Sequence, residues 1–388
     1  MSEAACDVSI VIPCLNEELV IGEFVDWCFA GLKAARVTGE VLIVDSSTDQ
    51  SPKIAEAHGA RVITVPKRGL GRAYIDATPH IRGRWVILGD CDLTYDFREL
   101  GPFIERLRAG DEFVMGNRFS GRLEKGAMPA LHQHFGTPLT TGLLNVIYGT
   151  RLGDIHCGMR GLTADAYRAI KIQSQSWEYA TEMIIKAVHL KLKMSEVPIA
   201  FYKDRPGRES HHKRGGWLSP WYAGWITLQA MFTFGADFFL IKPGVVFLAV
   251  GLAIVLATSL GPVDIGPLGL SLHWMLAGMC AAVLGLQAIY LGILARLFYD
   301  HTGVMAARYQ KRLSYNRSVI FSGLLFAAGV AMTAPLIFDY VRFGFHLPAL
   351  LPRYYMTVTG LLFMIAAFLN FAFTLLIHAF MAVKEYWR

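Results

Sequence analysis

The order of apolar and polar positions divides the 388-residue chain into two parts. Up to about residue 200, short apolar runs alternate with amphipathic stretches. Long apolar stretches then occupy about 238–260, 273–298, 318–341 and 356–383. Short apolar runs between helical patterns are typical of a parallel α/β sheet, whereas about 18 apolar residues in a row are enough to cross a bilayer. The pattern therefore predicts a soluble α/β domain followed by an all-α transmembrane domain of four helices.

The short apolar runs of the first part are the predicted strands, and several of them end in polar residues. We expect strands at Val8–Ile12, Glu40–Val44, Arg61–Val65, Trp85–Gly89 and Glu112–Met115. Pro13–Glu17 follow the first strand, Asp45 the second and Asp90–Asp92 the fourth. Because ligands bind beyond the carboxyl ends of strands in such sheets, these three segments are expected to share one ligand-binding edge. No G-x-G-x-x-G follows the first strand, which argues against a dinucleotide-binding domain.

Asp90 and Asp92 form the strongest candidate for a metal site. Side chains one residue apart at the end of a strand point to the same face, and two carboxylates so placed repel each other unless a cation compensates them. Mg²⁺ and Mn²⁺ prefer carboxylate and phosphate oxygens. An isolated pair of this kind is most often a solvated loop that caps the next helix. Its position at the shared edge favours a Mg²⁺ or Mn²⁺ site.

Composition and charge exclude several classes of protein. The chain is 54% hydrophobic, which is too apolar for a wholly soluble protein, and its net charge is +6 with no dense block of Lys and Arg, so we expect a membrane and no nucleic acid as partner. The six cysteines have no paired spacing, so neither a disulfide framework nor a zinc site is indicated. The histidines at 132, 134, 211 and 212 match no standard metal spacing either.

Five motifs together resemble those of a known family. They are Pro13-x-x-Asn16-Glu17, Val44-Asp45-Ser46-Ser47-Thr48-Asp49, Gly89-Asp90-Cys91-Asp92, Gly116-Asn117-Arg118-Phe119 and the segment Asp154–Arg160. Over residues 7–215 the chain is similar to the inverting family 2 glycosyltransferases, and within them to the polyprenyl-phosphate glycosyltransferases, such as dolichyl-phosphate mannose synthases and undecaprenyl-phosphate glucosyltransferases. The resemblance implies a GT-A fold, which is Rossmann-like with a mostly parallel sheet, over residues 1–215. It also implies transfer of one hexose from a UDP- or GDP-sugar to an undecaprenyl or dolichyl phosphate.

The resemblance also implies the residues of the nucleotide-sugar site. The metal would be held by Asp90 and Asp92, and the donor site would comprise Pro13, Asn16, Glu17, Asp45, Gly71, Asp90, Cys91 and Asp92. Three positions depart from the family pattern. Ser46 replaces a usual second acid, Thr94 stands where Gln is frequent, and residues 132–134 are His-Gln-His where an Arg is expected. Asp49 suits a helix cap as well as a donor contact.

A phosphate acceptor changes the chemistry that the protein must supply. A phosphate monoester is mostly ionised at neutral pH, so it needs positive charge and alignment and no strong base. Arg118, expected at a strand end, is the first candidate, because a guanidinium matches phosphate with two hydrogen bonds. A surface salt bridge is the alternative for Arg118. The full set expected for the acceptor phosphate is Arg118, Arg160, Arg205, Arg208, Ser210 and Lys213.

Some of these residues have structural alternatives. Asp154 is expected to act with Asp90, Asp92 and Arg118 in catalysis, on sugar hydroxyls or as a weak base, but an internal Asp154–Arg160 ion pair would explain both residues. Residues 202–213 form a basic loop that suits either a phosphate clamp or a patch facing anionic lipid. Glu178 and Glu182 lie four residues apart, as on a solvated helix face.

The second part is expected to be membrane-bound. Trp217, Trp221 and Trp225 recur at intervals of four, so residues 216–236 are predicted to form an interfacial amphipathic helix before a transmembrane domain at 237–388, although a core helix would show the same pattern. Residues 130–148 are a second interfacial candidate. The connection 299–317 is basic and 261–272 has no Lys or Arg, which predicts a multi-pass protein of the plasma (inner) membrane with a cytoplasmic catalytic domain and cytoplasmic termini. Arg342 and Arg353 go against this orientation. The helices are also candidates for contacts within a homo-oligomer.

Two other functions are alternatives to this one. A glycosyltransferase with a hydroxyl acceptor would need a positioned carboxylate base, and its relatives carry a QxxRW motif that this chain lacks. A non-catalytic membrane scaffold with a decayed domain is disfavoured because Asp90 and Asp92 are both present.

Overall fold

The computed structural model describes residues 6–208, 219–298, 300, 304–347 and 353–386. The chain divides into an N-terminal unit, Met1–Phe234, and a C-terminal unit, Gly235–Arg388. Each unit has its own packing, so each is considered by itself. The predicted boundaries at 215 and 236 stay predictions.

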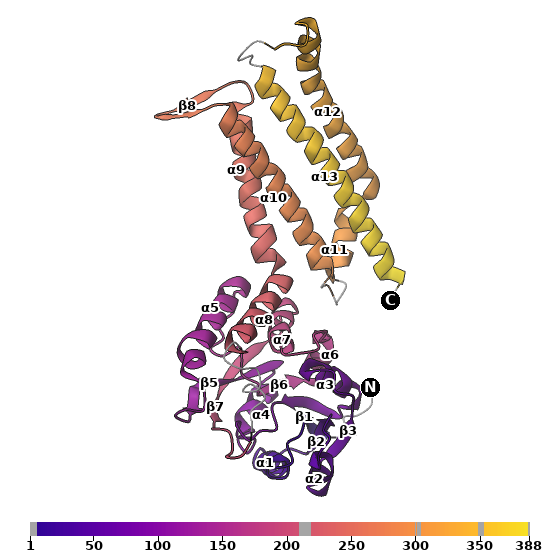
Figure 1. The fold of residues 1–388 in the computed structure, drawn as a ribbon. Helices are drawn as coiled ribbons and strands as arrows, with labels where there is room; N and C mark the ends of the chain where they lie inside the picture. The colour runs from indigo at the N-terminus through magenta and orange to yellow at the C-terminus, as the bar shows by residue number, and fades with distance from the viewer. Residues whose placement is uncertain (1–5, 209–218, 299, 301–303, 348–352, 387–388) are drawn as a thin grey trace. The chain divides into compact units, whose positions relative to one another are not determined.

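The N-terminal unit is built on a seven-stranded sheet with the order β3-β2-β1-β4-β6-β5-β7 (Figure 1). The strands are β1 Cys6–Cys14, β2 Gly39–Asp45, β3 Arg61–Thr64, β4 Gly83–Leu88, β5 Phe113–Leu123, β6 Arg160–Thr163 and β7 Met194–Phe201. Neighbouring strands are parallel except around β6, which is antiparallel to both β4 and β5. The central apolar runs of β1, β2 and β4 are buried, as expected for strands covered on both faces. The predicted GT-A fold is confirmed.

Helices join these strands in the order that the sequence pattern predicts. They are α1 Ile21–Ala34, α2 Ser51–Ala57, α3 Leu70–Ala77, η1 Thr78–His80, α4 Gly101–Arg108, η2 His132–Gly136, α5 Thr137–Tyr148, α6 Ala164–Ile170, α7 Tyr179–His189 and α8 Ser219–Phe234. Residues 16–18 precede α1 as a loop that is hydrogen-bonded to residues 47–51. Before α4, the Arg98 side chain folds back and donates two hydrogen bonds to Asp96.

The largest difference from the sequence prediction concerns β5. The strand expected at Glu112–Met115 continues to Leu123, because it pairs with β7 along its length through a register shift between Asn117 and Arg122. Arg118 therefore lies inside a long strand, at the irregularity, and not at a strand end. A register shift of this kind re-aims the side chains near it.

The C-terminal unit contains four helices long and apolar enough to cross a membrane, at Asp237–Thr258, Leu272–Phe298, Tyr315–Arg342 and Arg353–Val383. These spans match the four apolar stretches of the sequence. The elements of the unit are η4 Asp237–Ile241, α9 Lys242–Thr258, β8 Val263–Ile265, β9 Leu268–Leu270, α10 Leu272–Phe298, α11 Val304–Arg312, α12 Tyr315–Arg342 and α13 Arg353–Tyr386. Figure 1 shows α9 beside α10 and α12 beside α13.

Glycines bring the paired helices close together. A Cβ atom at Gly285 of α10 would collide with the α9 backbone at Leu248, and one at Gly360 of α13 would lie 2.7 Å from the carbonyl of Gly329 on α12. Arg353 pairs with Asp339, so one of the two cations that oppose the predicted orientation is compensated locally. The side of the membrane on which each connection lies stays a prediction.

Candidate active site

Two loops interlock at the carboxyl ends of β1 and β2. The Asn16 N–H donates to Ser47 Oγ over 2.8 Å, and the Thr48 N–H donates to Asn16 Oδ1 over 2.8 Å. The Glu17 N–H donates to Ser51 Oγ over 2.9 Å. Asn16 has a φ of 56°, a left-handed conformation that Asn tolerates better than most residues. Asn16 therefore shapes the loop around the predicted donor site through its own bonds.

Asp45 ends β2 at this edge and is 1% exposed. Its Oδ2 atom accepts a bond from the Ser47 N–H over 3.2 Å. Its Oδ1 atom is buried and has no hydrogen-bond partner among the residues that the structure describes. A buried carboxylate oxygen without a donor is costly, so this atom suits a ligand that brings a hydroxyl or an amide. The predicted contact of Asp45 with the nucleoside is consistent with this oxygen atom accepting no hydrogen bond from the described residues.

Asp90 and Asp92 lie at the end of β4 in the neighbouring loop. Burial and the nearby Asp92 carboxylate raise the pKa of Asp90 to about 7, although Arg208, Arg118 and Arg160 oppose the shift. Burial also raises the pKa of Asp92, against Arg208 and two bonds from Thr94. Both carboxylates are thus poorly compensated within the protein itself. A divalent cation would reverse this electrostatic penalty.

The donor set fits Mg²⁺ or Mn²⁺ held in part by the substrate. Two carboxylates are hard oxygen ligands, and Mg²⁺ is often held by one or two carboxylates together with phosphates. Among the described residues, no group of three or more His, Cys, Asp and Glu side chains is placed to hold a metal. Thr94, where the family often has Gln, donates its hydroxyl and its N–H to Asp92 Oδ1. Thr94 therefore orients Asp92, and the remaining ligands would be diphosphate oxygens and water.

Cys91, between the two aspartates, faces the first loop. Its Sγ atom donates to the Pro13 carbonyl oxygen over 3.4 Å. This contact joins the loop that carries Asp90 and Asp92, the candidate metal-site loop, to the end of β1. Cys91 and Pro13, both predicted for the donor site, are thus brought together by the fold.

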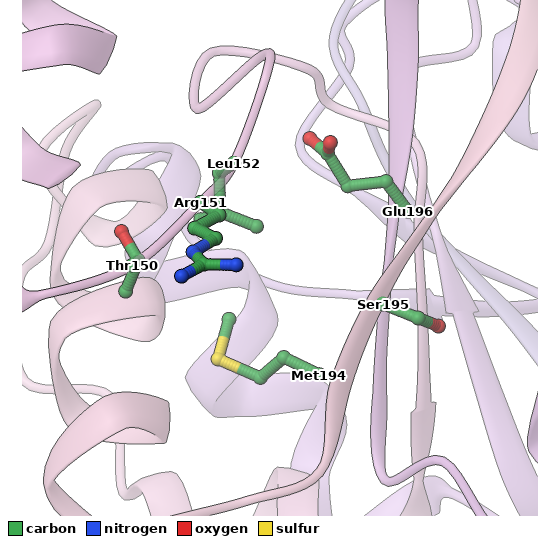
Figure 2. Close-up of a pocket in the computed structure, with 6 residues that line it drawn as sticks. All are labelled: Thr150, Arg151, Leu152, Met194, Ser195 and Glu196. Atoms are coloured by element: carbon green, nitrogen blue, oxygen red, sulfur yellow. The ribbon is translucent and has the colours of Figure 1, made fainter.

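A hollow of about 240 Å³ opens near the loop that carries Asp154 (Figure 2). It is lined by Thr150, Arg151, Leu152, Met194, Ser195 and Glu196. None of these residues was predicted from the sequence. Among them, Glu196 has bonds that reach the predicted site, as shown below.

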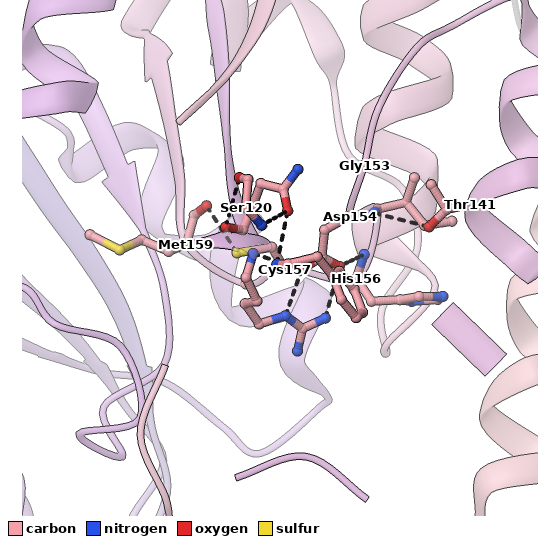
Figure 3. Close-up of polar contacts among 12 residues, drawn as sticks. Ser120, Thr141, Gly153, Asp154, His156, Cys157 and Met159 are labelled. Carbon is pink, nitrogen blue, oxygen red and sulfur yellow. Dashed lines mark hydrogen bonds and ion pairs between the residues drawn. The ribbon is translucent and has the colours of Figure 1, made fainter. Parts of the chain in front are cut away.

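Arg118 and Asp154 form a buried ion pair. Arg118 Nε lies 2.6 Å from Asp154 Oδ2, and Nη2 donates to Oδ1 over 2.9 Å. The main-chain N–H of His156 also donates to Asp154, over 3.2 Å (Figure 3). The Arg118 bonds and charge lower the pKa of Asp154 against its burial. Asp154 is therefore an ionised carboxylate held by Arg118. The alternative that Asp154 pairs with Arg160 is wrong, and so is the surface salt bridge for Arg118, which lies inside the fold.

Arg160 has a different environment from Arg118. Its side chain is fully buried and donates to the carbonyl oxygens of Cys157, Ala180 and Ile155, at 3.0, 2.7 and 3.2 Å. Three of its five donors are thus used to hold the 154–160 loop in shape. Its predicted contact with the acceptor phosphate is untested, and this geometry favours a role in holding the loop.

The 154–160 loop also touches Asp90. The Gly158 N–H donates to the Tyr95 hydroxyl over 2.8 Å, and a Cβ atom at Gly158 would lie 2.6 Å from Asp90 Oδ2. The loop that carries Asp154 is therefore in contact with the metal-site loop. The predicted donor and acceptor sides are adjacent in the fold.

The described part of the basic loop, residues 202–208, contacts the predicted donor side. Arg208 binds Glu17 through two bonds of 2.6 Å and Asp204 over 2.7 Å, and lies 3.7 Å from Asp92. Arg205 pairs with Glu23 of α1. Ser210 and Lys213 lie outside the described residues. Among the arginines expected around the acceptor phosphate, Arg205 and Arg208 are thus paired with Glu23 and Glu17. Arg118 and Arg160 instead contact the 154–160 loop.

Gly71 and Glu182 have structural explanations. A Cβ atom at Gly71 would collide with the Ser174 carbonyl oxygen, so this glycine permits close packing of α3 against residues 174–176. Glu182 is buried, accepts bonds from the N–H groups of Gln173 and Ser174, and pairs with Lys186. A solvated helix face is therefore wrong for Glu182. Nothing places Gly71 against the donor edge, and its predicted role is untested.

Two residues near the ion pair were missed by sequence reasoning. His156 bonds Thr140 Oγ1 on α5 over 2.8 Å, and burial with the positive charge of Arg118 lowers its pKa to about 4. Glu196 on β7 accepts bonds from the N–H groups of Gly153 and Asp154, at 2.8 and 3.2 Å. A Glu in a strand has no local pattern that indicates such bonds, because both partners are distant in sequence.

Comparison with known proteins gives a consistent result. The model of the family described as glycosyl transferase family 2 matches residues 9–171. The low-salt glycan biosynthesis hexosyltransferase Agl6 of Haloferax volcanii is 34% identical over 350 residues, which cover 89% of this chain and 82% of that protein. The dolichyl-phosphate hexose transferase of the same organism is 31% identical over 52% of this chain and 85% of its own.

More distant similarities were also found. The dolichyl-phosphate beta-glucosyltransferase of Drosophila melanogaster is 28% identical over 50% of this chain and 66% of its own. Among solved structures, mannosyl-3-phosphoglycerate synthase from Rubrobacter xylanophilus is similar over 58% of this chain and 72% of its own, at 22% identity and a TM-score of 0.45.

Proposed function

Because the chain belongs to glycosyl transferase family 2, we propose that this glycosyltransferase moves one hexose from a UDP- or GDP-sugar to a polyprenyl phosphate, with inversion at the anomeric carbon and with Mg²⁺ or Mn²⁺. Two of its relatives are named for transfer to dolichyl phosphate. Undecaprenyl phosphate presents the same phosphate monoester. The long apolar helices of the C-terminal unit suit an acceptor that is dissolved in a membrane.

The donor side supports a nucleotide-diphospho-sugar. Asp90 and Asp92 would hold the metal, which when bound supplies charge stabilisation to the departing diphosphate. The unsatisfied Oδ1 atom of Asp45 would accept a bond from the nucleoside. Cys91, Pro13, Asn16 and Glu17 would form the wall of this site through their loop contacts. These roles are part of the proposal.

The observation that carries the proposal is the preformed Arg118–Asp154 pair, whose Asp154 belongs to the loop that contacts Asp90. The pair uses Nε and Nη2 of Arg118, and the remaining terminal nitrogen, Nη1, would bind the acceptor phosphate. Asp154 is held ionised by Arg118, and it would fix the guanidinium rather than remove a proton. A phosphate acceptor is already ionised and needs no such base, so the arrangement suits it better than a hydroxyl.

The membrane part of the proposal follows from charge. The catalytic domain and both termini would lie on the cytoplasmic side of the plasma membrane, with the basic connection around Arg308–Arg317 on that side. Residues 216–236 would lie at the membrane surface, and the transmembrane helices would anchor the enzyme and provide the contacts of a homo-oligomer.

A direct test uses the full chain in detergent or vesicles. It is incubated with Mn²⁺ or Mg²⁺, a panel of labelled sugar nucleotides and undecaprenyl or dolichyl phosphate. An acid-labile lipid-linked sugar is expected, and Asp90→Ala should abolish it. Product formed only on hydroxyl acceptors would favour the alternative glycosyltransferase, and no product with any donor would favour the scaffold.

Arg118→Ala tests the acceptor side separately. It should raise the KM for polyprenyl phosphate far more than the KM for the sugar nucleotide, because Arg118 is expected to touch the acceptor alone. An equal rise in both KM values would remove its assigned role.

A further inference from the structure

Glu196 joins the two segments that carry the buried ion pair. Its Oε1 atom accepts bonds from the N–H groups of Gly153 and Asp154, at 2.8 and 3.2 Å. Its Oε2 atom accepts a bond from Asn117 Nδ2 over 3.2 Å. One carboxylate on β7 therefore reaches the main chain of Asp154 and the residue that precedes Arg118. Figure 2 shows the Glu196 side chain at the edge of the hollow, which Leu152 also lines.

Asn117 links Glu196 to the main chain of β5. Its Oδ1 atom accepts bonds from the N–H groups of Phe119 and Ser120, at 2.9 and 3.0 Å, across the register shift of the strand. Those two donors fix the orientation of the amide, so that Nδ2 faces Glu196. The Ser120 hydroxyl closes the turn by donating to the Asn117 carbonyl oxygen over 3.3 Å. The Asn117 amide thus bonds the main chain of the irregular part of β5, which contains Arg118, through Oδ1 and bonds Glu196 through Nδ2.

Gly153 shows how tightly this arrangement is packed. A Cβ atom there would collide with Asn117 Nδ2 and lie 3.3 Å from Glu196 Oε2. The loop can approach the strand this closely only because residue 153 has no side chain. Glu196 then satisfies the two main-chain N–H groups at the start of the loop. The loop and the strand are joined by these bonds and by the ion pair itself.

We propose that Glu196 is the positioning residue of the acceptor side, setting the register between the loop that carries Asp154 and the strand that carries Arg118. The proposal rests on the proposed function, because the guanidinium so placed would bind the polyprenyl phosphate. Glu196 bonds neither the Arg118 guanidinium nor the Asp154 carboxylate, so it acts through the main chain and Asn117. A carboxylate is required because both of its oxygens must accept bonds. Displacement of a binding group by about 1 Å can cost up to about 100-fold in rate.

The test replaces one acceptor atom at a time. Glu196→Gln keeps one oxygen for the loop N–H groups but brings an amide nitrogen against Asn117 Nδ2, so the bond to the strand is lost. We expect the KM for polyprenyl phosphate to rise about 10-fold, with the KM for the sugar nucleotide unchanged. Asn117→Asp alone places two carboxylates face to face and should raise the acceptor KM at least as much.

The double variant Glu196→Gln/Asn117→Asp restores the bond with donor and acceptor exchanged. Its acceptor KM should return to within about 3-fold of the original value, which a general loss of folding would not produce. The matched control is Glu112→Gln, since Glu112, which precedes β5, also accepts a main-chain N–H, that of Lys193, which precedes β7, over 2.9 Å. This control should change neither KM.

Each outcome bears on the inference. An unchanged acceptor KM in Glu196→Gln, an equal rise in both KM values, or no rescue in the double variant overturns it while leaving the proposed function intact. Absence of lipid-linked product from the unmodified protein overturns the proposed function, and this inference with it.

Discussion

The proposed donor and acceptor sides of the site differ in how their buried charges are compensated. On the donor side, Asp90 has a pKa raised to about 7, and Asp45 keeps a buried oxygen with no partner among the described residues. On the acceptor side, Asp154 has a lowered pKa because Arg118 binds both of its oxygens. The loops that carry Asp90 and Asp154 are in direct contact, because Gly158 lies against Asp90.

This difference indicates which side a ligand must complete. Uncompensated carboxylates hold a cation strongly, since binding removes their mutual repulsion. A guanidinium already fixed by a carboxylate loses little freedom when a phosphate binds, which is the advantage of preorganisation. Under the proposed function, the donor side would therefore depend on metal and substrate, whereas the acceptor side would be assembled by the protein alone. The predictions below test that contrast.

Asp90→Asn should have the largest effect. Loss of a metal-holding carboxylate is expected to lower activity by about 1,000-fold, the size seen when one electrostatic contact to a developing charge is removed. The same change should raise the stability of the metal-free protein at pH 7 or above, because a carboxylate whose folded-state pKa is raised destabilises the fold when ionised. Steady-state kinetics and thermal unfolding measure the two effects. A fall in both activity and metal-free stability would contradict the contrast.

Asp154→Asn should change stability in the opposite direction. It leaves the Arg118 guanidinium buried without a counter-charge, which typically costs about 3–5 kcal/mol. The expected drop in the thermal midpoint is on the order of 10 °C. Asp165→Asn is the control, since Asp165 is fully exposed 3.7 Å from Arg168, and its midpoint should not change. If Asp154→Asn is as stable as the original protein, the acceptor side is not preassembled in the way described.

Metal binding should depend on pH through Asp90. Only the ionised carboxylate binds a cation, so protonation competes with the metal below the pKa of about 7. The affinity for Mn²⁺ should therefore rise by up to about 10-fold per pH unit between pH 5 and 7 and then level off. Mn²⁺ titration by electron paramagnetic resonance measures it, and Asp90→Asn should flatten the profile. A flat profile in the unmodified protein would mean that Asp90 is already ionised at pH 5.

His156 should give the smallest effect. Its folded-state pKa of about 4 lies below the usual value of 6.5, so the unfolded chain takes up a proton first as the pH falls. The contribution of neutral His156 to the free energy of unfolding is therefore fully present above pH 6.5. It is lost as the pH falls towards 4, by up to about 1.4 kcal/mol per pH unit. His156→Gln keeps a hydrogen-bonding group for Thr140 and should reduce this acid sensitivity of the thermal midpoint. An unchanged pH dependence would show that other groups cause it.

Much of the fold was predictable because its signals are local. Buried strands such as Val8–Ile12 are continuous apolar runs, and each of the four spans is an unbroken apolar stretch, so neither requires knowledge of distant partners. The position of Asp90 and Asp92 at a shared edge also followed, since the carboxyl ends of parallel strands meet there. The strand containing Arg118 was predicted too short, because its extension to Leu123 depends on pairing with β7.

The sequence by itself determined which residue types meet at this edge. Carboxylates follow the strands, and arginines come later in the chain. The sequence also determined that a membrane part follows the α/β part. Only the tertiary structure decided the partners. Asp154 pairs with Arg118 across 36 residues and not with Arg160, and Arg208 lies on Glu17, 191 residues away. Ion pairs and main-chain bonds depend on distances of about 3 Å between atoms that the folding of the whole sheet brings together, and no spacing along the chain encodes them. For the same reason, the bonds of Glu196 to Asn117 and Asp154 became visible only in the folded chain.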